Sequence, residues 1–406
     1  MSFWDRLFGR KSVTRVRDLT IREPDGWTFG HASYAGETVS ETSVLALSAA
    51  WACVNLIAGT IATLPLMVYR TDREGVRTVA QDHGLYRLLH DSPNADQTAI
   101  DFWESVCASI ELWGNAFARK EMTGSRVSAL VPVRPDIVTV RRLDTGLLEY
   151  QWTEDGQART AAQSGMLHIR GFGGSPLGGL STIRYGRQTF GLSSAIDRAA
   201  GSTFANGLRP SGVLAFKDWL TSEQRDIAEK RLTEKFIGAM NAGRPLVLEG
   251  GTEWKPLTIN PEDAQMLESR SFSVEDICRF FGVPPFMIGH TEKTTSWGSG
   301  VEQAVLGFQK FTIGPRLRRI EQALTKQLLG PADLAAGLKV EFNLEGLLRG
   351  DSAGRAGFYQ TMSQIGAMTI NEIRAKENLP PVAGGDVPRM QMQNVPITEA
   401  GHVPAE

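Results

Sequence analysis

Histidines and cysteines are the residues here best suited to catalysis or metal binding, yet neither set has a catalytic or ligand-like spacing. Zinc sites take their ligands from closely spaced Cys and His residues. The six histidines are instead dispersed, at positions 31, 83, 90, 168, 290 and 402. His168 lies in a predicted strand, where a half-buried, hydrogen-bonded histidine explains it better than a ligand. The sequence therefore predicts no metal site and no cofactor.

The three cysteines, Cys53, Cys107 and Cys278, are far apart, and each lies in an apolar helical pattern. Free cysteine behaves as a small hydrophobic residue. An odd number without a close pair indicates buried thiols in a reducing compartment.

Acidic pairs and glycine-rich turns give no enzyme signature either. Glu262-Asp263 and Glu275-Asp276 are adjacent residues, which point to different faces of a helix, so helix-start stabilisation and a solvated face explain them. The glycine-rich run 171–179 lacks the G-K-[ST] ending of a P-loop and the dinucleotide-binding spacing, which favours a flexible connection. There is no nucleophile elbow and no Cys–His pattern. We expect a protein that is not an enzyme.

Composition places the chain among soluble globular proteins, with 22% charged and 42% hydrophobic residues in 406. The formal charge of −2 argues against tight binding of nucleic acid through neutralisation of many phosphates. It does not argue against weak contacts with DNA. The uncharged stretch 44–69 is long enough to span a membrane. Polar residues interrupt it and Leu64-Pro65-Leu66 breaks it, so a buried helix over 43–63 and a strand over 65–70 explain it better.

The first half of the chain predicts an α+β unit after an arm, residues 1–40, that lacks sustained periodicity. Apolar spacing and turn residues predict further helices over 83–89 and 98–113, and strands over 116–121, 127–133, 137–142, 148–152 and 166–169.

The second half predicts a long helix over 182–206 and a compact insert over 209–259. Within the insert we expect a strand at 213–216, a charged helix at 223–236 and a hairpin of 245–249 with 254–257. Asn260-Pro261 then opens a helix that Gly282-Val283-Pro284-Pro285 ends. A helix kinked at Gly314-Pro315, a strand over 339–343 and short helices around Gly366 follow.

The loop between these helices, residues 289–298, is poor in apolar residues. Ser299 and Glu302 have capping-box spacing and open the next helix. The loop holds one lysine, Lys293, and one large aromatic residue, Trp297, among small polar residues. The loop does not need to be buried in a hydrophobic core, so we expect it to project from the fold and contact something outside it.

These residues carry a resemblance to a known family. The run from Pro261 through Phe280-Phe281-Gly282-Val283-Pro284-Pro285 to Glu292-Lys293-Thr294-Thr295-Ser296-Trp297-Gly298-Ser299-Gly300-Val301-Glu302-Gln303 closely resembles the portal, or head–tail connector, proteins of lambdoid long-tailed bacteriophages with cross-linked capsids. Further matching runs are Leu64-Pro65-Leu66, Gly114-Asn115-Ala116, Phe204-Ala205-Asn206-Gly207, residues 345–353 and Asn378-Leu379-Pro380-Pro381. Together they cover most of residues 40–400.

The resemblance implies a phage portal fold that assembles as a dodecameric ring at one capsid vertex. The parts it implies are an arm (1–40), a wing (41–181), a stem helix (182–208), a clip (209–260), a second stem helix (261–288, helical over 261–281), a tunnel loop (289–299), a kinked helix and strand returning to the wing (300–350), a short helical crown (351–390) and a flexible tail (391–406). Double-stranded DNA would be packaged and ejected through the ring. The implied partners are the terminase large subunit, the head–tail adaptor and the major capsid protein, with no membrane, in the virion and, during assembly, the host cytoplasm.

The resemblance also assigns candidate site residues. The tunnel-loop set expected to contact DNA is Lys293, Thr294, Thr295, Ser296 and Trp297. The clip set expected to dock the terminase and the adaptor is Arg244, Leu246, Glu249, Trp254 and Lys255. Arg316, Arg318 and Arg319 could line the channel or form salt bridges between subunits. Lys293 could instead be an ordinary surface lysine, and Trp297 could pack back on its own loop.

Three functions compete at this point. The leading one is a structural DNA conduit. A nucleic-acid enzyme of the packaging machinery conflicts with the missing motifs. Another head–tail adaptor, packaging or tail-tube component conflicts with the size and the helix–insert–helix plan. A portal of a gene-transfer particle is a further alternative.

Overall fold

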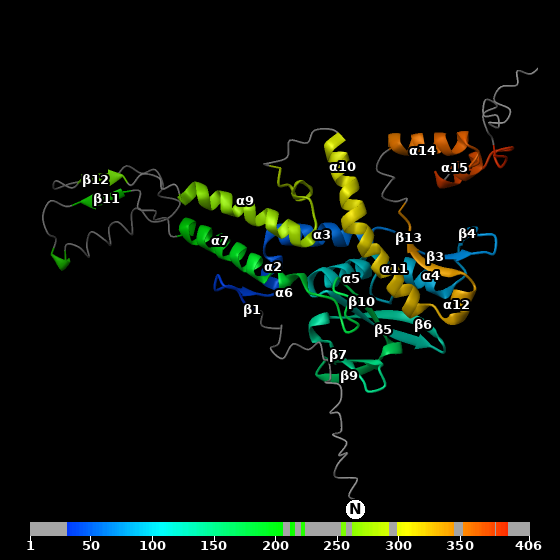
Figure 1. Cartoon of the computed structure of the whole chain (residues 1–406), viewed down its shortest axis with the longest axis horizontal. Coiled ribbons are helices and arrows are strands. Elements are labelled where there is room, and N and C mark those ends of the chain that lie inside the picture. Colours follow the sequence, from blue (N-terminus) through cyan, green and yellow to red (C-terminus); the bar gives the residue numbers. More distant parts are fainter. Residues whose placement is uncertain are drawn as a thin grey trace, which may run out of the picture. The chain divides into compact units, whose positions relative to one another are not determined.

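The computed structural model describes residues 31–205, 212–215, 221–223, 253–256, 262–291, 299–344, 352–377 and 379–388. The chain divides into two compact units, Met1–Glu341 and Phe342–Glu406. The helices of the first unit are α2 (Glu41–Leu45), α3 (Ser48–Ala62), α4 (Gly84–His90), α5 (Ala99–Trp113), α6 (Thr182–Tyr185), α7 (Arg187–Ala205), α9 (Glu262–Phe281), α10 (Ser299–Gly307), α11 (Gly314–Leu328) and α12 (Pro331–Ala335). Runs of helices and runs of strands follow one another along the chain, as expected for an α+β protein (Figure 1).

The strands form small separate sheets rather than one large one. The described strands are β1 (His31–Ala32), β2 (Thr38–Val39), β3 (Leu66–Thr71), β4 (Arg77–Val79), β5 (Asn115–Thr123), β6 (Arg126–Val133), β7 (Thr139–Arg142), β8 (Leu148–Glu154), β9 (Gln157–Ala162), β10 (Met166–Arg170), β11 (Gly212–Ala215), β12 (Glu253–Pro256) and β13 (Leu338–Phe342). They are ordered β1-β2, β10-β5-β6, β11-β12, β13-β3-β4 and β7-β8-β9.

Helices α3 and α5 pack against each other and form the helical part of the core. The charge-free stretch tested above as a membrane span is this buried helix, α3, followed by β3. Helix α5 begins at a capping box in which Thr98 and Asp101 bond each other's backbone amides, and it ends at Gly114. Gly114 has a φ of +72° and an added Cβ would lie 2.3 Å from the Leu180 oxygen, so glycine is required there.

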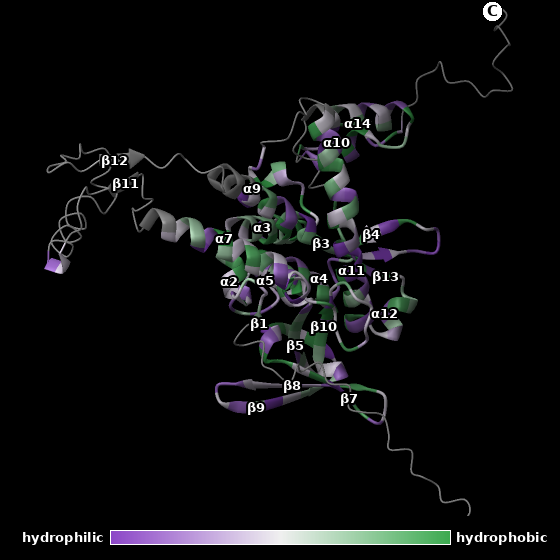
Figure 2. Ribbon diagram, turned by 60° about the vertical axis from the view of Figure 1, so that its left-hand side comes forward, coloured by the Kyte–Doolittle hydropathy of each residue, from purple (hydrophilic) through white to green (hydrophobic). Residues whose placement is uncertain are grey.

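The sheets β10-β5-β6 and β7-β8-β9 share a second core. β8 buries every second residue, whereas β5 and β10 each bury their first four residues in succession, and Figure 2 colours β10 mostly as hydrophobic. The buried residues of this core are Phe117, Val133, Val138, Val140, Leu148, Tyr150, Trp152, Met166 and Leu177.

His168, on β10, is a satisfied core histidine, 1% exposed rather than half-buried as expected. Its Nε2 lies 3.0 Å from Asn115 Oδ1 and its Nδ1 lies 3.3 Å from the Tyr150 hydroxyl. Asn115 Oδ1 also accepts from the Gly179 amide, so His168 donates from Nε2 and accepts at Nδ1. Burial, and then the charge of Arg170, lower the pKa of His168 to about 3. The ring is therefore neutral.

Four short strands were not predicted. β9 and β4 expose nearly all their side chains, so they lack the apolar alternation by which a strand is recognised, and β9 is largely hydrophilic in Figure 2. The hairpin β1–β2 lies within residues 1–40, which the sequence had assigned entirely to a mobile arm. A tertiary contact holds the hairpin to the rest of the unit: Arg198 Nη2 of α7 lies 2.5 Å from Glu37 Oε2.

Two long helical segments differ from expectation in detail. The segment 182–206 is broken at Gly186 into α6 and α7. The helix after the loop begins at Ser299 itself, so Ser299 is its first residue rather than its cap. Near Gly314-Pro315 the expected kink takes the form of a π-helical segment, Phe308–Ile313, between α10 and α11, and Figure 1 shows the axis changing direction there.

The structure describes only part of the predicted insert, residues 209–259, so only some of its predicted elements can be compared. β11 pairs antiparallel with β12, so residues 253–256 have a partner strand in 212–215. Strand 245–249 and nearly all of helix 223–236 lie outside the described residues.

The second unit holds α14 (Ser352–Gln364) and α15 (Ile370–Lys376), separated at Gly366 as expected. Asn371, 8% exposed, fastens the following segment to α15. Its Nδ2 donates to the Val382 carbonyl (3.0 Å) and to Asp386 Oδ1 (2.8 Å), while its Oδ1 accepts from the Val382 amide (2.8 Å).

None of the helices in the described ranges is long and apolar enough to cross a bilayer.

Candidate functional site

Helices α7 and α9, the predicted stem helices, run side by side and antiparallel (Figure 1). Phe190, near the start of α7, lies 5.8 Å and 6.1 Å from the rings of Phe280 and Phe281 at the end of α9. Further along, Arg270 Nε lies 3.0 Å from Asp197 Oδ1. This ion pair is exposed and therefore contributes little stability. The packing of the aromatic rings contributes more to holding the two helices together.

Glycines on α7 and directly before it make close contacts inside the chain. An added Cβ at Gly191 would lie 2.2 Å from the Ser33 side chain of the β1–β2 hairpin, and one at Gly186 would lie 2.5 Å from the Phe190 ring. At these two positions the close neighbour is the same chain, whereas an added Cβ at Gly201 meets nothing within 4 Å.

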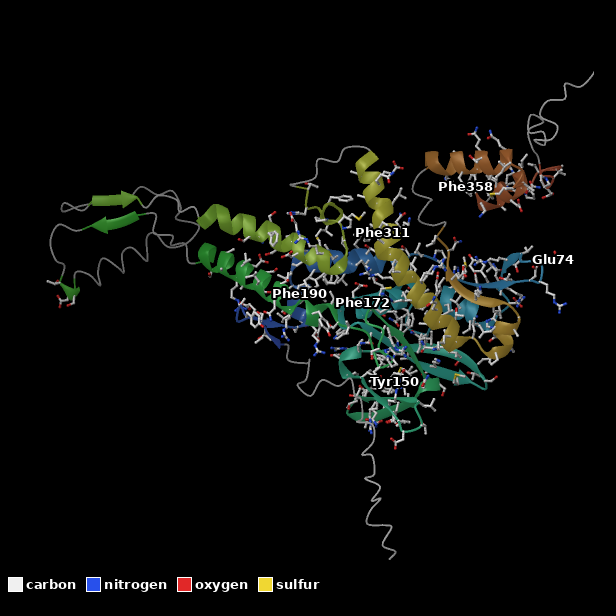
Figure 3. The ribbon with its side chains drawn as sticks, viewed as in Figure 1. Glu74, Tyr150, Phe172, Phe190, Phe311 and Phe358 are labelled. Atoms are coloured by element: carbon white, nitrogen blue, oxygen red, sulfur yellow. The ribbon has the colours of Figure 1, made fainter. Side chains whose placement is uncertain are left out.

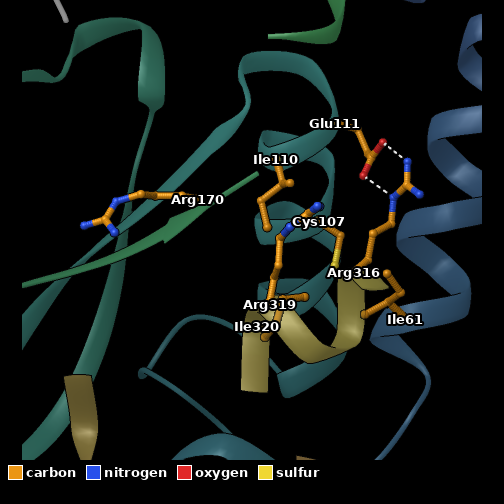
Figure 4. A pocket seen from close by; sticks show the side chains of 8 residues that line it. All are labelled: Ile61, Cys107, Ile110, Glu111, Arg170, Arg316, Arg319 and Ile320. Atoms are coloured by element: carbon orange, nitrogen blue, oxygen red, sulfur yellow. Dashed lines mark hydrogen bonds and ion pairs between the residues drawn. The ribbon is translucent and has the colours of Figure 1, made fainter. Parts of the chain in front are cut away.

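Arg316, near the start of α11, joins three elements, and Figure 4 shows its pairing with Glu111. Its Nε and Nη2 donate to the two carboxylate oxygens of Glu111 on α5, at 2.6 and 2.8 Å. Its Nη1 donates to the Thr312 carbonyl of the π-helical segment (2.9 Å), and its Nη2 also donates to the Phe281 carbonyl at the end of α9 (3.0 Å). Thr312 Oγ1 adds a bond to the Gly282 carbonyl (2.6 Å). We call this set the Arg316 junction.

The ion pair of the junction is buried, with side-chain exposures of 20% for Arg316 and 6% for Glu111. Burial acts to lower the pKa of Arg316, but the hydrogen bonds and charge of Glu111 outweigh it and raise the pKa. The guanidinium thus stays charged and is neutralised within its own chain. The sequence had placed Arg316 either on the channel wall or in a salt bridge between subunits; the salt bridge found lies inside one subunit.

The other two candidate arginines are more exposed. Arg318, 68% exposed, donates from Nη1 to Glu321 Oε2 at 2.9 Å. The Arg319 guanidinium carbon lies 6.0 Å from the ring centroid of Phe172, which is itself 70% exposed. Their side chains are therefore more accessible to a partner than that of Arg316, although Arg318 already pairs with Glu321.

The pocket beside the junction is too small for a substrate. Its lining comes from α3, α5, β10 and α11, and its volume of about 10 Å³ is no more than a single water needs (Figure 4). The lining residues are Ile61, Cys107, Ile110, Glu111, Arg170, Arg316, Arg319 and Ile320.

The described residues fix both ends of the predicted tunnel loop. Gly282, at φ +71°, ends α9, and a 3₁₀ turn over Pro285–Ile288 leads to Gly289 at φ +85°. His290 then returns to α9, with its Nε2 3.3 Å from Ser271 Oγ. The helix α10 begins at Ser299. Of the tunnel-loop set, Lys293, Thr294, Thr295, Ser296 and Trp297 all lie outside the described residues.

Ser271, His290 and Glu275 are of the residue types that make a catalytic triad, but their geometry differs. In a triad the nucleophile and the acid bind opposite nitrogens of the imidazole ring. Here the Ser271 hydroxyl and Glu275 Oε1 (4.0 Å) both approach Nε2. Glu275 also pairs with Arg279. The cluster braces the loop against α9 and lacks the arrangement needed to activate a serine.

The clip candidates are covered only in part. Trp254 and Lys255 lie in β12, where they pair with Leu214 and Val213 of β11. Arg244, Leu246 and Glu249 lie outside the described residues.

All three cysteines are buried and free, as expected. The fold nevertheless brings Cys53 of α3 and Cys278 of α9 together, with their sulfur atoms 4.0 Å apart. Burial raises the pKa of Cys107, so that thiol is not a nucleophile. Within the described ranges no three His, Cys, Asp or Glu residues gather as metal ligands would.

Sequence reasoning missed Glu111, although a signal for it exists. Trp103, Cys107 and Glu111 follow one another at intervals of four, and the first two are buried. They therefore share one face of α5. A carboxylate continuing a buried apolar stripe requires a cationic partner. The sequence does not say which arginine supplies it.

The comparisons with known proteins agree with this architecture. Residues 48–378 match the family model described as phage portal protein, and the chain belongs to that family. It is 37% identical to the portal protein of Enterobacteria phage HK97 over 374 residues, which cover 91% of this chain and 88% of the relative. It is 31% identical to the probable portal protein of Streptomyces phage phiC31 over 404 residues, or 95% and 87% of the two chains. The resemblance recognised in the sequence is confirmed.

Solved structures share the fold. A chain from the neck of an empty gene transfer agent particle, computed with C6 symmetry, matches with a TM-score of 0.59 and 27% identity, covering 82% of this chain and 90% of that one. An HK97 family phage portal protein from Corynebacterium diphtheriae matches with a TM-score of 0.54 and 16% identity over 78% and 100% of the two chains, a likeness of fold. The chain is thus a portal protein with an α+β portal fold.

Proposed function

We propose that copies of this chain form a ring at one vertex of a capsid and that double-stranded DNA passes through the ring during packaging and ejection. The observation that carries the proposal is the antiparallel pair α7–α9, which the Arg316 junction fixes to the wing elements at the point where the candidate tunnel loop begins. Membership of the portal family and the symmetric neck that contains a related chain support it.

The ring would act as a structural conduit rather than an enzyme. The serine–histidine cluster near the loop lacks triad geometry, and the small pocket beside Arg316 has no room for a nucleotide. A net charge of −2 suits a channel along which DNA must slide, because every additional phosphate contact strengthens the hold on DNA.

The remaining assignments extend this proposal. The insert 209–260 is the docking surface for the terminase large subunit and later for the head–tail adaptor, with Arg244, Leu246, Glu249, Trp254 and Lys255 as candidate contacts. The ring is a dodecamer that contacts the major capsid protein. It resides in the virion after assembly in the host cytoplasm. Arg318 and Arg319 are the candidate channel arginines that keep an exposed charge.

The tunnel-loop assignment is tested by replacing Lys293 and Trp297 together with alanine. Each residue recurs once per copy, so Lys293 would form a ring of cations that touch phosphates transiently. We expect normal rings but impaired DNA packaging or retention. Lys339→Ala/Tyr34→Ala, which removes an exposed lysine and a 93% exposed aromatic residue elsewhere, is the matched control. Full-length, stably retained genomes in the Lys293/Trp297 variant would refute the loop assignment, and wild-type chains that never form rings would refute the conduit.

A portal of a gene-transfer particle is a second candidate. A related chain, 25% identical with a TM-score of 0.59, comes from the virion of a native gene transfer agent, covering 84% of this chain and 94% of that one. Sequencing DNA from purified particles separates the two: one uniform genome indicates a phage, and random host fragments indicate a gene-transfer particle.

A further inference from the structure

Two buried thiols from distant parts of the chain meet where the end of α9 packs on α3 (Figure 1). Cys53, in α3, is 0% exposed, and Cys278, in the last turn of α9, is 1% exposed. Their sulfur atoms lie 4.0 Å apart, although 225 residues separate them in the sequence. The sulfurs of a disulfide lie about 2 Å apart. Side-chain rotation and a small shift of the helix end therefore have to bring the two sulfurs about 2 Å closer.

The pair lies just below the surface at the end of α9. The residue after Cys278, Arg279, has a side chain that is 59% exposed, and Phe280 is 41% exposed. Phe190 of α7, labelled in Figure 3, packs against the rings of Phe280 and Phe281. These rings cover the helix end against large reagents. An oxidant as small as hydrogen peroxide needs only a brief local opening to reach Cys278.

A hydrogen bond between the two thiols distinguishes their roles. Cys53 donates its S–H to the Cys278 sulfur. This bond lowers the pKa of Cys278 against the opposing effect of burial, and it raises the pKa of Cys53. The thiolate rather than the thiol reacts with oxidants, and a second cysteine beside it can resolve the product. Cys278 is therefore the sulfur that reacts first, and Cys53 is the resolving thiol.

We propose that Cys53 and Cys278 form a reversible disulfide when the protein meets hydrogen peroxide. The Cys278 thiolate attacks one peroxide oxygen and the O–O bond breaks, giving a sulfenic acid and a hydroxide that takes up the Cys278 proton to form water. The Cys53 sulfur then bonds to the Cys278 sulfur. The S–O bond breaks, and its hydroxyl leaves with the Cys53 proton as a second water. The two sulfurs lose two electrons, which reduce one peroxide molecule to two water molecules.

The cross-link ties the end of α9 to α3. The candidate tunnel loop follows α9, so oxidation adds a covalent bond near the base of that loop, where the Arg316 junction already binds the Phe281 carbonyl. It also closes a loop of 225 residues, which restricts the unfolded chain and so stabilises the fold. The inference goes beyond the proposed function and needs neither the ring nor DNA, so its failure leaves the conduit proposal intact.

The first test exposes the folded full-length chain to hydrogen peroxide, removes the peroxide, unfolds the chain and alkylates the remaining thiols. We expect two of the three cysteines to be protected from alkylation and one pair of linked peptides, which contains Cys53 and Cys278. On a non-reducing denaturing gel the monomer should migrate faster, because the link makes the unfolded chain more compact. Dithiothreitol should restore alkylation at all three cysteines.

Two single variants separate the pair from cysteine oxidation in general. Cys107→Ala removes the other buried cysteine, so it is the matched control and should form the link at the wild-type rate. Cys53→Ala should form no link and should instead accumulate the sulfenic acid of Cys278, which dimedone traps. At one fixed protomer concentration, oxidation should raise the Tm of the wild type by about 3–6 °C and leave that of Cys53→Ala unchanged.

The wild-type peptide map decides the question even if a variant fails to fold. Three free thiols after peroxide treatment would overturn the inference, because the oxidant then does not reach the pair. Sulfinic acid at Cys278 without a link would overturn it as well, because the sulfurs then do not approach each other in the folded chain. A link that forms only in denaturant, or that joins two copies, would have the same consequence.

Discussion

Replacing Glu111 with glutamine should strongly destabilise the first unit, because it leaves the Arg316 charge buried without a counter-charge. The guanidinium has five N–H donors. Those on Nε and Nη2 bind Glu111 at 2.6 and 2.8 Å. The glutamine side chain keeps one acceptor oxygen for one of these two nitrogens. Towards the other nitrogen it presents an NH2 group, which is a donor, so that hydrogen bond is lost. Breaking a buried pair by removing one partner costs about 3–5 kcal/mol.

Thermal unfolding, followed at one fixed protomer concentration because assembly also stabilises the fold, measures the effect. A loss of about 3 kcal/mol in a unit of about 300 residues corresponds to a Tm lower by about 5 °C, at an unfolding entropy of about 2 cal/mol/K per residue. The control is Glu121→Gln, the same substitution in an exposed pair in which Arg119 Nη2 lies 3.0 Å from Glu121 Oε1. It should change stability by less than about 1 kcal/mol.

A double variant distinguishes lost charge balance from lost packing. Glu111→Leu/Arg316→Met removes both charges and keeps apolar volume, so it should recover most of the stability that Glu111→Gln loses. Equal melting of Glu111→Gln and Glu121→Gln would refute the importance of the pair. A double variant as unstable as the single one would show that the bonds to the Phe281 and Thr312 carbonyls, rather than charge balance, matter most.

Two further predictions follow from buried positions. The folded-state pKa of His168 is about 3, below its ordinary value, so its contribution to stability is complete above about pH 6.5 and falls by about 1.4 kcal/mol per pH unit as the pH drops towards 3. Wild type should therefore lose stability faster than His168→Gln between about pH 6 and 4 in denaturant titrations; parallel curves would contradict this. Gly114→Ala should destabilise by more than about 3 kcal/mol, because left-handed strain and a clash with the Leu180 carbonyl add up. Gly124→Ala, at φ +63° with nothing within 4 Å, should cost about 1 kcal/mol in the same melting assay, and equal losses would show that the clash is relieved.

Local sequence signals predicted most of the elements, because their causes lie within a few residues. Thr98 and Gly114 delimit α5, and Gly282 with Pro284-Pro285 ends α9, as expected. Strands with an apolar face, such as β8, were found, whereas the exposed β9 was not, since it has no periodic pattern to detect. The family could also be recognised from the sequence, because its motifs are contiguous runs of residues.

Contacts between distant residues could not be predicted in this way. The Gln327 side chain pairs with the His168 backbone in both directions, at 3.0 and 2.9 Å, across 159 residues of sequence. Either partner alone looks like an ordinary polar residue on its element. The candidate DNA contacts at Lys293 and Trp297 remain predictions of the sequence, because they lie outside the described residues.

By itself the sequence determined the α+β class, the portal family and where the candidate loop begins and ends, because capping, turn residues and family motifs act over short distances. Only the tertiary structure decided that Arg316 pairs with Glu111 of its own chain, and that Val301 and Leu306 of α10 stay exposed. Whether a charge is neutralised or an apolar side chain is covered depends on neighbours from other elements, and burial is a property of the folded chain rather than of any segment.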